Sequence, residues 1–374
     1  MKTLETDVLV VGGGPAGAST ALSLLNYSNL KVVLVEQSDL SGHRIGENVS
    51  ASIFNLLDYL KIDKNDLESD WICPTNATVS LWGNEYPVTI DPLLSSSRSS
   101  YQIDRQKLDF HLLQTIADRG GIVLPRTRYI NISRPDNSSW NIDVSHATKG
   151  KLKIACKFLV DATGRKASLC KHLKVPTQRL DTLMGVGIFF DENKATENPK
   201  VQCIESTESG WWYTSHLPKG KRIIVFFSDA KIIAHNHFNE IGYWTKNLSK
   251  TREIKKWYSL NHPPLKEELW IKDASSRITN TSQINNFIAV GDAASSFDPI
   301  SSMGIGFAMT SSFHAARHIK NIISNNFSSD SNHYQKNIEE HYHQYVSLRD
   351  QFYNKENRWN SYPFWAKRLP GSGR

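Results

Sequence analysis

The chain has 374 residues, of which 39% are hydrophobic and 22% are charged, and its formal net charge is +7. At roughly 150 residues per domain this length predicts two domains, and the ordinary composition excludes wholesale disorder and fibrous repeats. The positive charge suits an anionic cofactor or an acidic partner surface. Because the basic residues are scattered and no nucleic-acid motif accompanies them, we expect no binding to nucleic acid.

No apolar stretch approaches the roughly 20 residues that span a bilayer, so we expect no association with a membrane. The N-terminus runs directly into a strand without the features of a signal peptide, which predicts a cytoplasmic location. The four cysteines lie far apart, so neither a metal site nor a disulfide framework is expected. They are Cys73, Cys156, Cys170 and Cys203.

The first candidate site is a glycine-rich turn between a strand and a helix. A β-branched strand over 7–11 leads into the sequence GGGPAG at 12–17, and an apolar helix follows. Gly12 permits a tight turn, Gly14 lets the backbone approach a pyrophosphate, and Gly17 lets the helix pack closely on the strand. The helix N-terminus also offers N–H groups to phosphates. The predicted contacts are Gly12, Gly14, Pro15, Ala16 and Gly17.

A second strand over 31–35 ends at Glu36. This acid lies roughly 20 residues beyond the first glycine, the separation at which a carboxylate accepts the ribose hydroxyls of a dinucleotide. Glu36 and its neighbour Gln37 are therefore candidate cofactor contacts. An acid here disfavours a 2′-phosphate, and so NADP, whereas FAD and NAD both remain open at this step.

A second glycine motif lies near the C-terminus. The sequence GDAA at 291–294 follows an apolar strand, and a helix start at 303–305 offers N–H groups to a flavin ring. With the N-terminal turn, this pattern resembles the single-component FAD monooxygenases related to p-hydroxybenzoate hydroxylase, the flavin-dependent halogenases and the geranylgeranyl reductases. The contacts that the resemblance implies are Gly291, Asp292, Pro299, Met303, Gly304 and Ile305, with Pro299 lining the flavin face.

Three further segments resemble elements of the same family. The sequence DATGR at 161–165 resembles its D-x-x-G element, YQIDR at 101–105 its aspartate-arginine element, and RIGE at 44–47 its R-x-G-E segment. The residues implied as cofactor contacts are Arg44, Glu47, Arg105, Asp161 and Gly164, and the strand around Tyr129 is expected to meet the adenine. For Arg44 and Glu47, a surface ion pair is the alternative.

The resemblance implies an α/β fold. A doubly wound, Rossmann-like FAD/NAD(P)-binding domain would carry an inserted antiparallel β-sheet substrate domain and C-terminal helices. The expected ranges are 1–175 for the first part of the FAD domain, with substrate-domain elements near 70–102, then 176–280 for the substrate sheet and 281–374 for the rest. Alternating strands are expected over 184–190, 210–215 and 222–228, and helices over 304–325 and 331–354.

The sequence GWWY at 210–213 resembles the aromatic strand of the family's substrate domain. A period of two places Trp211 and Tyr213 on one face and Trp212 on the other. That face is either sheet core or the wall of a substrate pocket, so Trp211 and Tyr213 are the pocket candidates. A second dinucleotide motif is not found, so NAD(P)H would meet the flavin transiently or a reductase would supply electrons, with O2 as co-substrate.

A finer resemblance rests on GDAASSFDPISSMGIGF at 291–307 together with residues 353–359 and 364–365. These segments are similar to the LodB and GoxB type of flavoprotein, required by lysine and glycine oxidases that carry cysteine tryptophylquinone. Nothing matches the W-x-W-x-I-P segment of halogenases. The resemblance implies an FAD-dependent monooxygenase that hydroxylates a tryptophan of a partner, the precursor of such an amino-acid oxidase.

Three other functions remain open. They are hydroxylation of a free aromatic molecule, reduction of unsaturated lipids in the manner of geranylgeranyl reductases, and a non-enzymatic chaperone that holds FAD. The sequence identifies no catalytic base and does not predict an oligomeric state.

Overall fold

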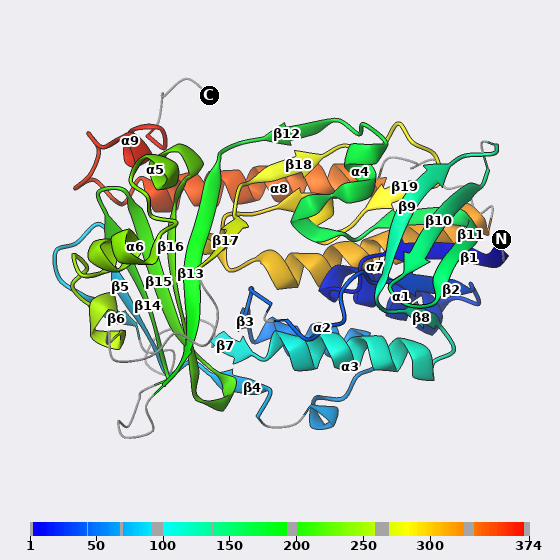
Figure 1. Cartoon of the computed structure of the whole chain (residues 1–374), viewed down its shortest axis with the longest axis horizontal. Coiled ribbons are helices and arrows are strands. Elements are labelled where there is room, and N and C mark those ends of the chain that lie inside the picture. Colours follow the sequence, from blue (N-terminus) through cyan, green and yellow to red (C-terminus); the bar gives the residue numbers. More distant parts are fainter. Residues whose placement is uncertain are drawn as a thin grey trace.

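The protein has two lobes, which lie at opposite ends of its long axis and are connected by long helices (Figure 1). Each lobe contains one seven-stranded sheet. The computed structural model describes residues 3–42, 44–67, 70–90, 100–136, 138–192, 200–258, 269–324 and 333–369. In these ranges no helix is both long and apolar enough to cross a membrane.

The first sheet has the strand order β8-β2-β1-β11-β10-β9, and β19 pairs with the end of β11. Parallel pairing joins β8, β2, β1, β11 and β19, whereas β9, β10 and the start of β11 form an antiparallel meander. All of β2 is buried, as expected for a parallel strand covered on both faces. The strands are β1 (Thr3–Val11), β2 (Val32–Val35), β8 (Ile122–Leu124), β9 (Thr127–Ser133), β10 (Trp140–His146), β11 (Gly150–Asp161) and β19 (Phe287–Ala289).

Helices cover this first sheet and extend toward the second (Figure 1). α1 (Pro15–Tyr27) packs against α3 (Arg105–Asp118) and α7 (Gly304–Ile323). The C-terminal helices expected from the sequence are confirmed as α7 and α8 (His333–Tyr353), although residues 325 and 331–332 lie outside the described ranges. The shorter helices are α2 (Ser52–Tyr59), α4 (Ser168–His172), α5 (Ala230–His235), α6 (Ile241–Leu248) and α9 (Pro363–Ala366).

The second sheet has the order β17-β13-β16-β15-β14-β5-β6. It is antiparallel except that β5 pairs in parallel with β14. The three strands expected here are confirmed as β13, β15 and β16, and β5 and β6 join them from far earlier in the chain. The strands are β5 (Ala77–Leu81), β6 (Val88–Ile90), β13 (Leu183–Asp191), β14 (Val201–Thr207), β15 (Gly210–Leu217), β16 (Lys221–Asp229) and β17 (Trp270–Asp273).

The two faces of the second sheet bury different side chains. Trp211 and Tyr213 pack on the face that also meets Tyr353 and Trp365, and Trp212 packs with Trp244 on the other. The alternation predicted from the sequence is therefore confirmed. Two three-stranded sheets complete the fold: β3 (Asn48–Ser50), β7 (Ser100–Ile103) and β4 (Ile72–Pro74), and β12 (Thr177–Arg179), β18 (Arg277–Thr279) and β20 (Ser295–Ser296).

Candidate cofactor and substrate site

The turn between β1 and α1 leaves no room for side chains at two of its glycines. Gly12 has a φ of +117°, and a Cβ there would overlap the carbonyl of Ala162 at the end of β11. A Cβ at Gly17 would overlap the Gly12 carbonyl oxygen. The Gly12 N–H donates to the Val35 carbonyl at 2.8 Å, which ties the turn to β2. Both glycines are therefore required for α1 to start against the ends of the parallel strands.

Gly14 differs from these two glycines because a Cβ there would meet nothing within 4 Å. Gly14 precedes α1, whose first-turn N–H groups have no partner within the helix. Beside the turn, Glu36 Oε2 accepts a hydrogen bond from the Gly13 N–H at 2.6 Å, and Oε1 accepts one from the Ser38 N–H at 2.8 Å. The open backbone and the anchored carboxylate fit the pyrophosphate and ribose of a dinucleotide.

Two arginines predicted as cofactor contacts share one buried acid. Arg44 Nη1 lies 2.9 Å from Asp109 Oδ2, and Arg105 Nη2 lies 3.1 Å from the same atom. Arg44 also lies 3.9 Å from Glu36 Oε1 and so connects this cluster to the glycine turn. Arg44 and Glu47 do not form the alternative surface ion pair, because Arg44 pairs with Asp109 and Glu36 and the Glu47 side chain is buried. The motifs did not identify Asp109, although its i,i+4 spacing from Arg105 was a usable signal.

Asp161 and Tyr129 make contacts within the protein. Asp161 Oδ1 accepts a hydrogen bond from the Thr163 N–H at 2.9 Å, and Oδ2 accepts one from the Cys170 N–H at 2.9 Å. The Tyr129 hydroxyl donates to the Ser168 carbonyl at 3.1 Å. These side chains hold the segment after β11 in place, so their proposed contact with a cofactor stays a prediction. The same holds for Gly164, which has a φ of +63°, and for Gln37.

Arg165 joins the middle segment to the C-terminal one, a role that the sequence did not reveal. Its Nε lies 3.4 Å from Asp292 Oδ2, and its Nη1 and Nη2 donate to the carbonyls of Ser275 and Phe297 at 2.8 and 2.6 Å. The side chains of Arg165 and Asp292 remain 25% and 30% exposed. Solvent therefore reaches the place where these two segments meet.

The C-terminal motif packs directly on the first turn of α1. Gly291 has a φ of +55°, and a Cβ there would lie 2.6 Å from the Ala16 Cβ. The Ser312 hydroxyl donates to the Ala16 carbonyl at 2.7 Å. At 1.5 Å per residue, Gly304 begins α7 roughly 12 Å before that contact. Met303 precedes the helix, and the N–H groups of Gly304 and Ile305 lie in its first turn.

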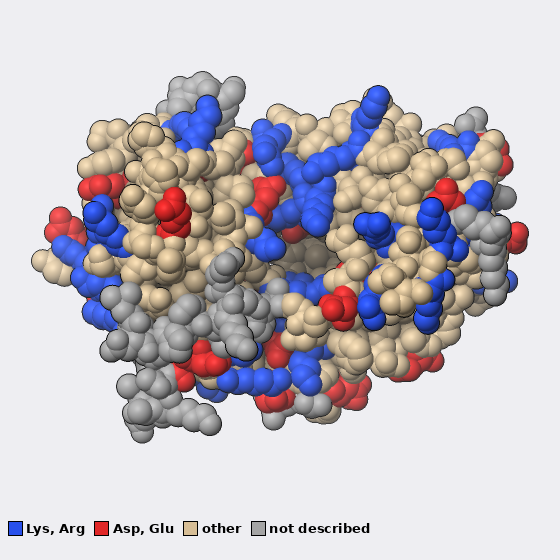
Figure 2. Space-filling model, in the orientation of Figure 1, with Lys and Arg blue, Asp and Glu red and all other residues tan. Residues whose placement is uncertain are grey.

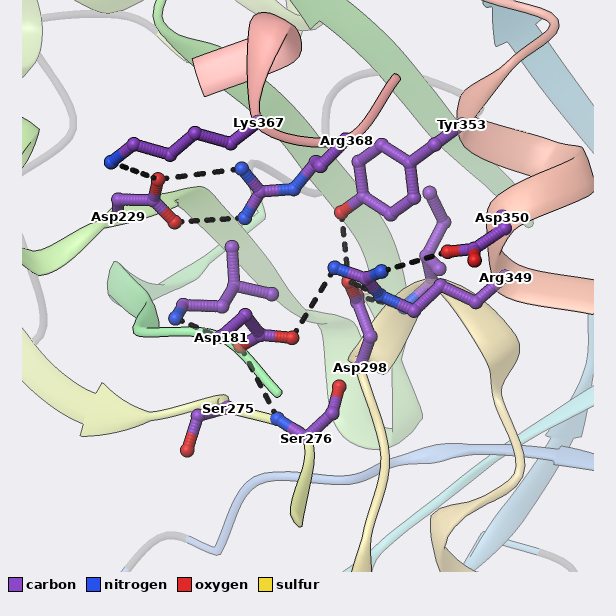
Figure 3. Close-up of polar contacts among 12 residues, drawn as sticks. Asp181, Asp229, Ser275, Ser276, Asp298, Arg349, Asp350, Tyr353, Lys367 and Arg368 are labelled. Atoms are coloured by element: carbon purple, nitrogen blue, oxygen red, sulfur yellow. Dashed lines mark hydrogen bonds and ion pairs between the residues drawn. The ribbon is translucent and has the colours of Figure 1, made fainter. Parts of the chain in front are cut away.

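The loop that carries Pro299 is fixed by a buried network (Figure 3). Asp298 Oδ1 accepts a hydrogen bond from the Ile300 N–H at 3.0 Å, and Oδ2 accepts one from the Tyr353 hydroxyl at 2.7 Å. The Tyr353 hydroxyl in turn accepts a hydrogen bond from Trp211 Nε1 at 3.0 Å. The end of α8 thus connects β15 of the second sheet to the predicted flavin-face loop.

Arg349 adds charge to this network. Figure 3 places it between two acids: its Nη2 lies 3.2 Å from Asp181 Oδ2, and its Nε lies 3.6 Å from Asp298 Oδ2. Burial raises the pKa of Asp298, and Arg349 acts in the opposite direction. The positive charge of Arg349 on α8 therefore balances the negative charges of Asp181, which precedes β13, and of Asp298 in the flavin-face loop.

The two pocket candidates have different surroundings. Trp211 is 1% exposed and stacks on Phe227 with 4.1 Å between ring centroids, so it forms part of the sheet core. Burial raises the pKa of Tyr213, and the Glu47 carboxylate acts in the same direction. Glu47 itself is 6% exposed. Glu47, which precedes β3, therefore acts electrostatically on Tyr213 of the second sheet.

The surface between the lobes is hollowed, and Lys and Arg side chains lie above and beside the hollow (Figure 2). Three arginines at the small sheet between the lobes act electrostatically on one another and on Asp273 and Asp292. They are Arg165, Arg179 and Arg277.

Among the described residues, no group of three or more His, Cys, Asp or Glu could hold a metal ion.

Comparisons with known proteins agree with this geometry. The sequence profile described as FAD binding domain matches residues 5–344. The chain is 37% identical over 369 residues to LodB of Marinomonas mediterranea, described as an FAD-dependent oxidoreductase, and the match covers 97% of this chain and 96% of that protein. A tryptophan 2-halogenase of Chondromyces crocatus is 26% identical over 394 residues, which cover 97% of this chain and 70% of the halogenase.

Two solved structures share the fold. The flavin-dependent halogenase CmlS has a TM-score of 0.84 and 21% identity, and the match covers 99% of this chain and 68% of that one. QhpG, a peptidyl tryptophan dihydroxylase essential for tryptophylquinone cofactor biogenesis, has a TM-score of 0.79 and 21% identity, with 98% and 79% covered. The resemblance and the fold class predicted from the sequence are both confirmed.

Proposed function

The chain belongs to the FAD-binding domain family and is an FAD-dependent oxidoreductase, and from this premise we propose that it is a monooxygenase acting on a tryptophan of a partner polypeptide. The partner would be the precursor of a tryptophylquinone-dependent amino-acid oxidase. The 37% identity to LodB and the fold shared with QhpG support this proposal. NAD(P)H or a reductase would supply the electrons, and O2 would be the co-substrate.

The observation that carries the proposal is the open meeting point of the cofactor segments. Arg165 and Asp292 are partly exposed, and a hollow with basic side chains lies between the lobes (Figure 2). A tryptophan within a folded precursor needs an entrance of this kind, whereas a free metabolite is compatible with a sealed pocket. The basic side chains suit an acidic surface on the precursor.

The cofactor segments divide the work of holding FAD. The open backbone at Gly14 and the first turn of α1 would hold the pyrophosphate, and Glu36 would hold the ribose. The first turn of α7 would stabilise negative charge on the flavin ring. When bound, FAD supplies the two-electron chemistry that activates oxygen, and the protein supplies position and exclusion of water.

Reduction of an unsaturated lipid fits the lobe junction less well. A lipid chain needs an apolar tunnel, whereas the buried side chains at this junction include Glu47 and Gln102, and Tyr213 beside them is partly buried. Two alternatives remain, the hydroxylation of a free aromatic molecule and a non-enzymatic role as an FAD-containing chaperone. The experiment below distinguishes both from the proposed function.

The deciding experiment is co-expression with a candidate precursor, followed by mass spectrometry of the precursor. We expect tryptophan to gain oxygen only when the flavoprotein, a reductant and O2 are all present. Purified protein should be yellow, and denaturation should release intact FAD, because FAD is expected to bind without a covalent bond. Rapid turnover of a free aromatic without any change in the precursor would favour a small-molecule hydroxylase. Maturation by an FAD-free variant would favour a chaperone.

A further inference from the structure

Three buried acceptor atoms at the lobe junction make no hydrogen bond with any residue that the structure describes. They are Glu47 Oε1, Asn48 Oδ1 and Gln102 Oε1. Buried polar atoms are nearly always paired, so a group of unpaired atoms in one place indicates a site for a ligand. The other Glu47 oxygen, Oε2, accepts a hydrogen bond from the Gly46 N–H at 3.1 Å.

Glu47, Asn48 and Gln102 come together at the small sheet of β3 and β7, which contacts the second seven-stranded sheet. The Ile103 N–H donates to the Glu47 carbonyl at 2.9 Å, and Asn48 lies opposite Gln102 in the pairing of β3 with β7. Asn48 Nδ2 donates to Gln202 Oε1 of the second sheet at 3.0 Å and approaches the Ser302 hydroxyl at 3.3 Å. Since Ser302 precedes the start of α7, the group lies beside the predicted flavin-ring contacts.

The unpaired atoms select for a ligand that donates hydrogen bonds. The oxygens of Glu47, Asn48 and Gln102 are acceptors, and the amide nitrogens of Asn48 and Gln102 already donate to Gln202. A carboxylate or phosphate would present further acceptors to this group and would be disfavoured. An indole N–H, by contrast, is a donor with no acceptor atom.

The carboxyl group of Glu47 is placed to exchange a proton near neutral pH. Burial raises the pKa of Glu47 to about 7, although backbone hydrogen bonds of Glu47 and Gly46 and the Arg105 guanidinium act in the opposite direction. Arg105 on α3 is the ionisable side chain that acts on Glu47, and Glu47 in turn acts on Tyr213 of β15. A proton acceptor works best when its pKa lies close to the operating pH.

We propose that Glu47 Oε1 binds the indole N–H of the substrate tryptophan and accepts its proton during hydroxylation, an inference that rests on the function proposed above. A ring carbon forms its bond to one oxygen atom derived from O2 as the O–O bond breaks, and the other oxygen atom leaves as water with the two electrons supplied by NAD(P)H or the reductase. Positive charge then develops on the indole nitrogen. Transfer of the N–H proton to Oε1 leaves the N–H electron pair on nitrogen, so the ring becomes neutral and Glu47 protonated.

The same ring carbon then loses its hydrogen as a proton to solvent. The C–H electron pair restores the aromatic ring, and Glu47 returns its proton to the nitrogen. Glu47 therefore ends the reaction unchanged, and the hydroxylated indole keeps its N–H. No other described residue needs to move a proton in this sequence.

The test compares the binding of indole and 1-methylindole, which lacks the N–H, to the FAD-loaded protein. Binding is followed by the change in flavin absorbance as a function of pH. A hydrogen bond to a charged group corresponds to a preference of at least about tenfold. We expect indole to bind about tenfold more tightly than 1-methylindole at pH 8 and to lose this advantage as the pH falls through 7.

Glu47→Gln should abolish the pH dependence, because an amide does not titrate, whereas Glu47→Asp should keep it with a smaller preference for indole. Glu340→Gln, at an exposed position on α8, is the matched control and should behave as the wild type. FAD content and thermal midpoint check that each variant folds. The inference would be overturned if the wild type showed no preference for indole. It would also be overturned if Glu47→Gln kept the preference with the same pH dependence as the wild type.

The precursor assay separates the two proposals. If the wild type adds oxygen to the precursor but does not distinguish indole from 1-methylindole, the inference about Glu47 fails and the proposed function stands. If the selectivity depends on Glu47 but the precursor gains no oxygen, the N–H site is supported and the proposed protein substrate is wrong.

Discussion

Gly14 and Gly17 lie in the same turn, but a methyl group would meet opposite surroundings at the two positions. At Gly14 it would meet nothing within 4 Å, and the backbone φ of −77° is open to any residue. At Gly17 it would overlap the Gly12 carbonyl oxygen. The first glycine thus keeps space for the cofactor, whereas the second keeps space for the fold.

We therefore expect Gly14→Ala to weaken FAD binding without lowering the stability of the FAD-free protein, since such a change often adds about 0.4–1 kcal/mol. Gly17→Ala should lower the free energy of unfolding by about 1–3 kcal/mol through overpacking. Denaturant unfolding of the FAD-free variants and titration with FAD measure the two effects separately. Equal loss of stability in both variants would contradict this division of roles.

Glu47 predicts a pH dependence of stability. Its pKa rises from 4.5 in the unfolded chain to about 7 in the fold, so the folded state binds the proton more strongly. Its contribution is complete below pH 4.5 and is lost as the pH rises through 7. Over this range the stability difference between the wild type and Glu47→Gln should change by about 3 kcal/mol. Urea unfolding at a series of pH values measures it, and parallel curves would contradict the burial of an ionisable Glu47.

At the scale of elements, the Tyr353 hydroxyl in the last turn of α8 joins Trp211 of β15 to Asp298 of the flavin-face loop by hydrogen bonds. Tyr353→Phe removes the donor to Asp298 and the acceptor for Trp211. Two buried polar groups lose a partner, which should lower the free energy of unfolding by about 1–3 kcal/mol. Tyr86→Phe, at a residue that is 77% exposed, is the control and should leave stability unchanged. A shift of the flavin absorbance spectrum in Tyr353→Phe alone would connect Asp298 to the position of Pro299.

The elements predicted correctly were those with local signals. The strands now seen as β13, β15 and β16 contain short runs of apolar and aromatic residues, and α7 and α8 follow recognisable motifs or apolar periods. The glycine turn was predictable because Gly12 and Gly17 meet steric demands within a short stretch of chain.

Contacts between distant segments could not be predicted in the same way. The parallel pairing of β5 with β14 joins residues 77–81 to 201–205, and no pattern within either strand names its partner. The ion pair between Asp298 and Arg349 could not be predicted either, because only the fold brings the two residues together and buries them. The catalytic role proposed for Glu47 depends on burial between two lobes, which a local motif does not contain.

At the scale of the whole molecule, α8 connects the two sheets. Near its start, the Tyr334 hydroxyl donates to the Ala289 carbonyl of β19 at 2.7 Å, and near its end Tyr353 contacts Trp211 of β15. Arg349 lies on the same helix between two buried acids. We therefore expect the lobes to unfold together, in one transition seen by both flavin fluorescence and tryptophan fluorescence.

Arg349→Met should disturb this coupling, because it leaves Asp181 and Asp298 buried without their cation. Breaking a buried ion pair by removing one partner lowers stability by about 3–5 kcal/mol. We expect the two fluorescence signals to separate into distinct transitions on denaturation. Lys336→Met, at an exposed position on α8, is the matched control and should retain a single transition. Coincident signals in Arg349→Met would show that other contacts couple the lobes.

The path of the chain through both lobes also governs when the protein can fold during its synthesis. The first sheet waits for β19 and α7, and the second is closed by late contacts such as the Gly83 N–H with Glu356 and Trp365 Nε1 with the Thr207 carbonyl. A ribosome that has translated the first 280 residues has therefore completed neither lobe. The nascent chain must keep the apolar faces of both sheets from aggregating until the final helices emerge, and the segments proposed to hold FAD are complete only once α7 has been made.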